Sequence, residues 1–119
     1  MSLSVVVSTK TINKDFISLI EKTSGVHKIE ILPYENKGKY SLTEVYNMGL
    51  KDSTNDIVLF CHDDIKFDTK NWGRKLLNHF KKSEYGIIGV AGCRYLPSSA
   101  KWWEVPSEMM GQVYHEHEG

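Results

Sequence analysis

The sequence has few cysteines, carries no net charge and lacks a long hydrophobic run. Each of these absences excludes a class of protein. The 119 residues include only two cysteines, which excludes a disulfide-rich scaffold and favours a reducing, cytoplasmic location. Both, Cys61 and Cys93, are interpreted as buried apolar side chains. Fifteen basic and fifteen acidic side chains cancel, so no global field favours nucleic acid or an anionic membrane. No apolar run approaches the roughly 18 residues of a membrane span, and no signal peptide is visible.

The most informative stretch is an apolar run that leads into a histidine and two aspartates. Residues 57–61 are too few for a helix and are rich in β-branched and aromatic types, which predicts a strand. The run does not alternate with polar residues, so we expect a strand covered on both faces, as in a parallel sheet. His62, Asp63 and Asp64 then follow at its carboxyl end, where open α/β sheets bind their ligands.

Strand and helix patterns alternate along most of the chain. Predicted strands cover residues 4–9, 26–32 (closed by Pro33), 57–61 and 86–92, and predicted helices cover 13–23, a segment opened by the capping box Ser41–Glu44, and 71–82. This order predicts a three-layer α/β core with a mainly parallel sheet over residues 4–95. Residues 96–117 are expected to form an extension, with a short final strand near 112–115. Residues 1–3 and 118–119 are interpreted as remnants of cloning.

The loops that follow the predicted strands meet at one edge of such a sheet. They are residues 8–10, 35–39, 62–66 and 93–95, and most of them begin with polar or charged side chains. Magnesium and manganese prefer carboxylate oxygens and take only one or two from the protein, together with ligand phosphates. His62, Asp63 and Asp64 are therefore candidates for a metal site. The alternative is a solvated turn before the next helix.

Residues 41–67 resemble the donor-binding half of a GT-A fold glycosyltransferase of the family-two type. The resemblance is carried by Asn47-Met48-Gly49 on a helix and by His62-Asp63-Asp64 after the next strand, in the place of an Asp-x-Asp metal motif. Gly-Val-Ala-Gly at 89–92 followed by Trp102-Trp103 is similar to a branch related to a streptomycin-biosynthesis glycosyltransferase-like protein. The resemblance covers roughly residues 4–115 and implies a Rossmann-like fold of the nucleotide-diphospho-sugar transferase type.

The resemblance implies a nucleotide-sugar donor, with a UDP-sugar expected first. Ser8 and Thr9 would face the uracil or ribose, and Glu35 or Asn36 would contact the base. Asn47 would line the donor site or brace its loops.

The same resemblance implies a divalent metal, manganese or magnesium. Asp64 takes the place of the second aspartate of the motif and is the implied metal ligand. His62 replaces the first aspartate, and Asp63, in the variable middle position, would touch the ribose.

Three further residues are candidates for substrate binding on chemical grounds. Arg94 follows the fourth predicted strand and can grip a diphosphate with two hydrogen bonds. Trp102 and Trp103 can stack on a sugar face, or else form a hydrophobic plug at the end of the sheet. Glu104 and Glu108 match no motif, so no catalytic base is assigned.

The sequence therefore predicts a glycosyltransferase-like domain that binds a nucleoside-diphosphate sugar with a divalent metal and transfers the sugar to a hydroxyl of a saccharide or other acceptor. The alternative is a non-catalytic or truncated nucleotide-sugar-binding domain that lacks the base. A receiver-like phosphoacceptor domain ranks last, because Ser8-Thr9 carries no acidic pair after the first strand.

Overall fold

The computed structural model of the chain describes residues 1–82, 84–101 and 103–111. The chain forms two compact units, Met1–Glu84 and a second that starts at Tyr85. The core expected over residues 4–95 and the extension expected over 96–117 stay predictions.

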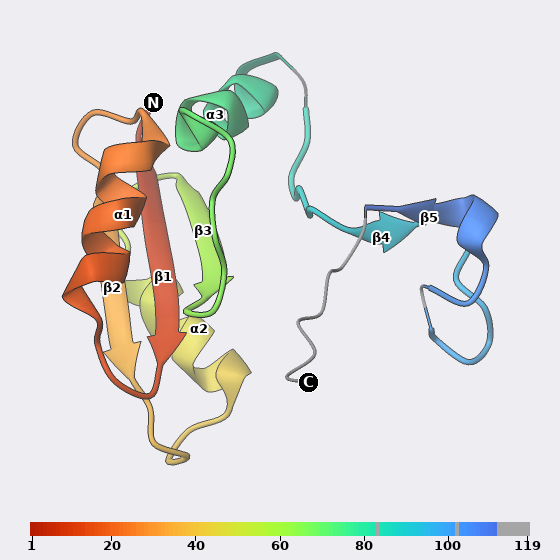
Figure 1. Cartoon of the computed structure of the whole chain (residues 1–119), viewed down its shortest axis with the longest axis horizontal. Coiled ribbons are helices and arrows are strands. Elements are labelled where there is room, and N and C mark those ends of the chain that lie inside the picture. The colour runs from red at the N-terminus through yellow and green to blue at the C-terminus, as the bar shows by residue number, and fades with distance from the viewer. Residues whose placement is uncertain (83, 102, 112–119) are drawn as a thin grey trace, which may run out of the picture. The chain divides into compact units, whose positions relative to one another are not determined.

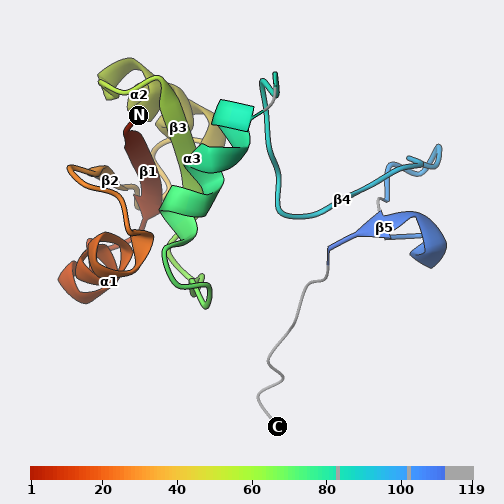
Figure 2. The same ribbon diagram turned by 90° about the horizontal axis from the view of Figure 1, so that it is seen from above.

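The first unit is a parallel sheet between two layers of helices (Figure 1). Strands β1 (Leu3–Thr9), β2 (Glu30–Glu35) and β3 (Ile57–His62) lie in the order β2-β1-β3, and β1 pairs in parallel with both neighbours. Helices α1 (Lys14–Ser24) and α3 (Trp72–Lys82) contact each other on one face, and α2 (Leu42–Asp52) covers the other face (Figure 2). The predicted three-layer α/β class with a parallel sheet is confirmed.

The core is built on β1. Alternate side chains of this strand, those of Leu3, Val5 and Val7, pack with Ile20 of α1 and with α3. Val6 points to the other face, where α2 crosses it at Gly49. A Cβ added to Gly49 would lie 2.2 Å from Val6 Cγ1, so only glycine allows α2 to pack this closely on the sheet.

The strand that follows residue 56 occupies a different position from the expected one. β3 is confirmed as a strand, but it lies at the end of the strand order, and β1 holds the centre. Phe60 of β3 is 39% exposed, whereas Val5 and Val6 of β1 are fully buried. Residues 57–61 do pack on both faces, with Cys61 in the core cluster and Phe60 4.8 Å from the ring of Tyr46 of α2, but the cover is less complete than on β1. An apolar run identifies a strand, but it does not say which strand is central.

The second strand is shifted along the chain relative to its prediction. Residues 26–32 were expected, whereas β2 covers Glu30–Glu35 and includes Pro33. The turn before it needs Lys28 in a left-handed conformation, with φ of 57°, which delays the start of the strand. Proline is compatible with β2 because this strand lies at the edge of the sheet, where a missing N–H can face away from the neighbour.

The helix starts follow the sequence closely. Asn13 caps α1 by accepting hydrogen bonds from the backbone N–H groups of Asp15 and Phe16. Ser41 caps α2 by accepting one from the N–H of Glu44, as the capping box predicts. These caps fix where the loops after β1 and β2 end, and those loops hold the candidate site.

The second unit contains a small antiparallel pair. β4 (Gly92–Cys93) pairs with β5 (Met109–Met110), which follows the short 3-10 helix η1 (Pro106–Glu108). The strand predicted over 86–92 is wrong for 86–91, which form no strand. Glycines at 86 and 89 weaken a strand because they add backbone entropy and offer no side chain to pack. The predicted final strand near 112–115 lies outside the described residues.

Candidate functional site

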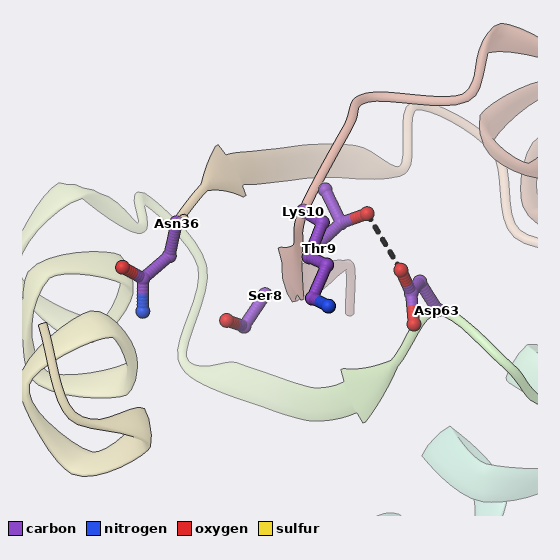
Figure 3. A pocket seen from close by; sticks show the side chains of 5 residues that line it. All are labelled: Ser8, Thr9, Lys10, Asn36 and Asp63. Atoms are coloured by element: carbon purple, nitrogen blue, oxygen red, sulfur yellow. Dashed lines mark hydrogen bonds between the residues drawn. The ribbon is translucent and has the colours of Figure 1, made fainter. Parts of the chain in front are cut away.

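A hollow of about 260 Å³ lies at the carboxyl ends of the three parallel strands (Figure 3). Its lining comes from the end of β1 and from the residues directly after β2 and β3: Ser8, Thr9, Lys10, Asn36 and Asp63. In Figure 3, Asn36 lies on one side of Ser8 and Asp63 on the other. Loops that are far apart in the sequence meet here because parallel strands end at the same edge of the sheet.

One hydrogen bond ties two of these loops together. The hydroxyl of Thr9 donates to Asp63 Oδ2 at 2.6 Å, across 54 positions of sequence, and also lies 2.9 Å from the carbonyl oxygen of Thr11. Thr9 is only 7% exposed, so the donor of this bond is buried, whereas Asp63 itself is exposed. The bond occupies one oxygen of the Asp63 carboxylate. The residue that β3 presents to the hollow is therefore Asp63, held in place from β1.

The thiol next to this carboxylate is not a nucleophile. Burial, together with the charge of Asp63, raises the pKa of Cys61 to about 12. A thiol with that pKa stays protonated at neutral pH and is unreactive. The interpretation of Cys61 as a buried apolar side chain agrees with its 6% exposure.

The loop after β2 places its two candidate residues differently. Asn36 lines the hollow, and its side-chain amide bonds the backbone of Tyr40 in both directions, at 2.6 Å from Nδ2 and 3.0 Å to Oδ1. These bonds close the loop and hold its shape. Glu35 does not line the hollow; its Oε1 accepts a hydrogen bond from the backbone N–H of Ile12 at 3.1 Å. Glu35 therefore ties the loop after β1 to the end of β2.

Lys10 is the lining residue that the sequence reasoning did not select. It stands directly after the buried Thr9, and its ammonium group is the only permanent positive charge among the described lining residues. The available signal was its position as the first charged residue after the first strand. A cation at the carboxyl edge of a parallel sheet suits the phosphates of a ligand.

His62 and Asp64 lie beside the hollow and do not line it. Both are exposed, and Asp64 makes no hydrogen bond or ion pair with any described residue. Within the described ranges no group of three or more histidine, cysteine or acidic side chains is arranged to hold a metal. A closed protein cage is therefore absent from the described part of the chain. Magnesium and manganese need only one or two carboxylates together with ligand phosphates, so the expected metal site stays a prediction.

The remaining candidates lie elsewhere. Asn47 is exposed on α2 and lines a separate hollow with Tyr40, Glu44, Met48 and Lys51. Arg94 and Trp103 belong to the second unit, and Trp102 lies outside the described residues. Their predicted contacts with a donor remain predictions.

A protein-family model described as "Glycosyltransferase like family" matches residues 4–119. The chain belongs to this glycosyltransferase-like family. Membership implies a sugar donor and an acceptor, and the match includes every residue that lines the hollow. The narrower resemblance to the GT-A fold and to the streptomycin-related branch stays a prediction. No curated protein and no solved structure matches the chain significantly. Among the described residues, no helix has the length and apolar character needed to cross a membrane.

Proposed function

We propose that this glycosyltransferase-like chain binds a nucleoside-diphosphate sugar at the hollow between the ends of β1, β2 and β3. The observation that carries the proposal is the bond from Thr9 to Asp63, which holds a carboxylate at the ligand-binding edge of the sheet. Family membership supports it, because sugar transfer needs an activated donor.

The nucleoside would lie between Asn36 and Asp63, over Ser8. Asp63 has one carboxylate oxygen taken by Thr9, and the other can accept a hydrogen bond from a ribose hydroxyl. A volume of about 260 Å³ is slightly below the roughly 300–1,000 Å³ of pockets that enclose a whole ligand. The hollow thus suits the nucleoside, with the diphosphate and sugar extending beyond it.

The diphosphate would lie near Lys10 and Asp64. Lys10 donates hydrogen bonds to phosphate oxygens, and Asp64, with no partner among the described residues, offers both oxygens to a divalent cation. His62, next to it on the exposed end of β3, is a secondary candidate ligand for manganese. A bound metal would stabilise the negative charge that builds up on the leaving diphosphate.

The proposal gives the adjacent carboxylates of Asp63 and Asp64 different roles. Asp63 orients the nucleoside, so its loss weakens binding with or without metal. Asp64 acts through the metal, so its loss removes only the metal-dependent part. The acceptor hydroxyl would lose its proton to a catalytic base and attack the anomeric carbon. None of the lining residues is assigned as that base.

A thermal-shift screen of UDP-, GDP- and dTDP-sugars, with and without manganese, tests the proposal. We expect one nucleotide class to raise the melting temperature and manganese to increase the rise. Asp64→Ala should abolish the manganese-dependent increment, whereas Asp56→Ala, the same change at the opposite end of β3, should keep it. If Asp64→Ala retains the full increment, the metal assignment is wrong. If no nucleotide stabilises the wild-type chain, the donor site is wrong.

A further inference from the structure

A third hollow, of about 360 Å³, lies at the end of the first unit opposite to the proposed donor site. One wall is the turn from α1 towards β2, with Gly25, Val26 and His27, and the other is formed by α3; Met1 also lines the hollow. In Figure 1 this turn and α3 lie at the top, and the carboxyl ends of the strands point down. The length of β1, seven residues, separates this hollow from the one at the proposed donor site by roughly 20 Å. This third hollow is therefore independent of the proposed donor site.

The charged side chains that line this hollow are all basic. Arg74, Asn78 and Lys81 line it from α3, spaced four and three residues apart and so on one face of the helix. None of its described lining residues is acidic. α3 as a whole carries four lysines and arginines and no aspartate or glutamate, although the whole chain is neutral. Such a concentration of positive charge in a concave surface attracts anions.

Arg74 is already oriented for binding. Its Nε donates to the carbonyl oxygen of Gly25 at 3.3 Å, which holds the guanidinium over the hollow. Neither Nη group donates to a described acceptor, so both Nη groups are available to donate hydrogen bonds to a phosphate. Because one hydrogen bond fixes the side chain beforehand, binding costs less side-chain entropy than at a mobile lysine.

The walls of the hollow are rigid. Gly25 ends α1 with φ of 69° and packs so tightly that an added Cβ would lie 2.6 Å from Asn71 Oδ1. The backbone N–H of Asn71 donates to the carbonyl oxygen of Thr23 at 3.0 Å, and the indole N–H of Trp72 donates to the Thr23 hydroxyl at 2.9 Å. These contacts lock the start of α3 to the end of α1, so the spacing between the turn and Arg74 is set by the fold.

We propose that this hollow, formed by the turn 25–27 and by Arg74, Asn78 and Lys81, binds a phosphoryl group. Arg74 would grip two phosphate oxygens, Lys81 would neutralise the remaining charge, and Asn78 and His27 would donate further hydrogen bonds. The same chemistry is offered by a phosphate in solution and by the phosphate of an anionic lipid headgroup. The site would therefore hold either a soluble phosphorylated molecule or a membrane surface.

An NMR titration of the ¹⁵N-labelled chain with inorganic phosphate and then pyrophosphate tests the proposal. We expect amide shifts at residues 25–27 and 78. Arg74→Gln with Lys81→Gln should raise the Kd at least tenfold. Lys75→Gln with Lys82→Gln removes the same charge from the same helix outside the hollow, and should change the Kd by less than about twofold.

Co-sedimentation distinguishes the two sources of phosphate. Binding to phosphatidylglycerol vesicles but not to phosphatidylcholine vesicles, lost in the Arg74/Lys81 variant and kept in the Lys75/Lys82 variant, supports the lipid source. Saturable binding of free phosphate at residues 25–27, without vesicle binding, supports the soluble source.

Three results would overturn the proposal: no shifts at residues 25–27 and no vesicle binding, equal weakening by both double variants, or shifts confined to residues 8–10. If the Arg74/Lys81 variant fails to fold, Arg74→Lys replaces it in the test. This change keeps the positive charge but removes the guanidinium that can donate two parallel hydrogen bonds to a phosphate. Unchanged binding by that variant would also contradict the model.

Discussion

Replacing Gly49 by alanine tests the packing that places α2 on the sheet. The added Cβ would lie 2.2 Å and 2.6 Å from the two methyl carbons of Val6, well inside ordinary contact. Val6 is fully buried in the central strand, and Gly49 is buried on α2, so neither can move into solvent. Rotation of Val6 about χ1 cannot clear both methyl groups, because a β-branched side chain always directs at least one methyl towards the helix side.

Two opposing effects set the expected magnitude. Alanine in place of glycine stabilises a helix interior by about 1 kcal/mol. Overpacking a tight core costs about 1–3 kcal/mol, and two contacts this short place Gly49→Ala near the upper end. We therefore expect a net loss of about 2 kcal/mol, the opposite sign to the one that helix propensity alone predicts.

Urea denaturation of wild type, Gly49→Ala, Val6→Ala and the double variant measures both the loss and its cause. Val6→Ala removes the two methyl groups that the new Cβ meets, so the double variant should be about 1–3 kcal/mol more stable than the sum of the single losses. Asn47→Ala, an exposed change on the same helix, serves as the control and should be neutral or slightly stabilising. Gly49→Ala with unchanged or higher stability, or no coupling with Val6, would refute the packing argument.

Three further predictions follow from contacts around the sheet. Hydrogen bonds from Ser4, and then from the loop before β3, lower the pKa of Glu30 from its usual 4.5. The ionised Glu30 carboxylate therefore stabilises the fold fully above pH 4.5, and this stabilisation is lost as the pH falls through the lower pKa of the folded state. Glu30→Gln should lower the melting temperature at pH 7, and the difference from wild type should shrink in acid. Thr9→Val frees the carboxylate of Asp63 and should weaken UDP binding about tenfold in calorimetry, whereas Thr9→Ser should bind within about twofold of wild type. Iodoacetamide at pH 8 should alkylate Cys61 about a hundredfold more slowly in the folded chain than in urea, because burial keeps the thiol protonated.

Periodicity and capping signals were enough to predict the helices and the edge of the sheet at which the loops converge. The Ser41–Glu44 pattern identified the start of α2 because the capping hydrogen bond is local in sequence. The convergence of the loops after β1 and β3 followed from parallel topology alone, and the structure brings Thr9 and Asp63 into contact there.

Strand order and strand ends could not be predicted in the same way. Both β1 and β3 are apolar runs, and only tertiary pairing makes β1 central and leaves Phe60 half exposed. Pro33 suggested a strand end, whereas the edge position of β2 accommodates it within the strand. The turn at Lys28, with its positive φ, has no sequence signal comparable to a glycine.

The directions of the side chains in the candidate site could not be predicted from the sequence either. The sequence places His62, Asp63 and Asp64 together, but the direction of each depends on contacts from another strand. Thr9 holds Asp63 at the hollow, and Asp64 is left without a described partner. Lys10 joins the site because β1 ends one residue before it, where the predicted strand over 4–9 also ends. The sequence thus placed Lys10 in the correct loop, but this position alone did not show that the side chain lines the hollow.

The most direct test is a crystal structure of the chain with UDP and manganese, read from the anomalous signal of the metal. We predict a manganese peak within coordination distance of the Asp64 carboxylate, with the diphosphate beside Lys10 and the ribose on Asp63. A manganese peak away from Asp64, or a nucleotide bound away from the ends of β1, β2 and β3, would contradict the account.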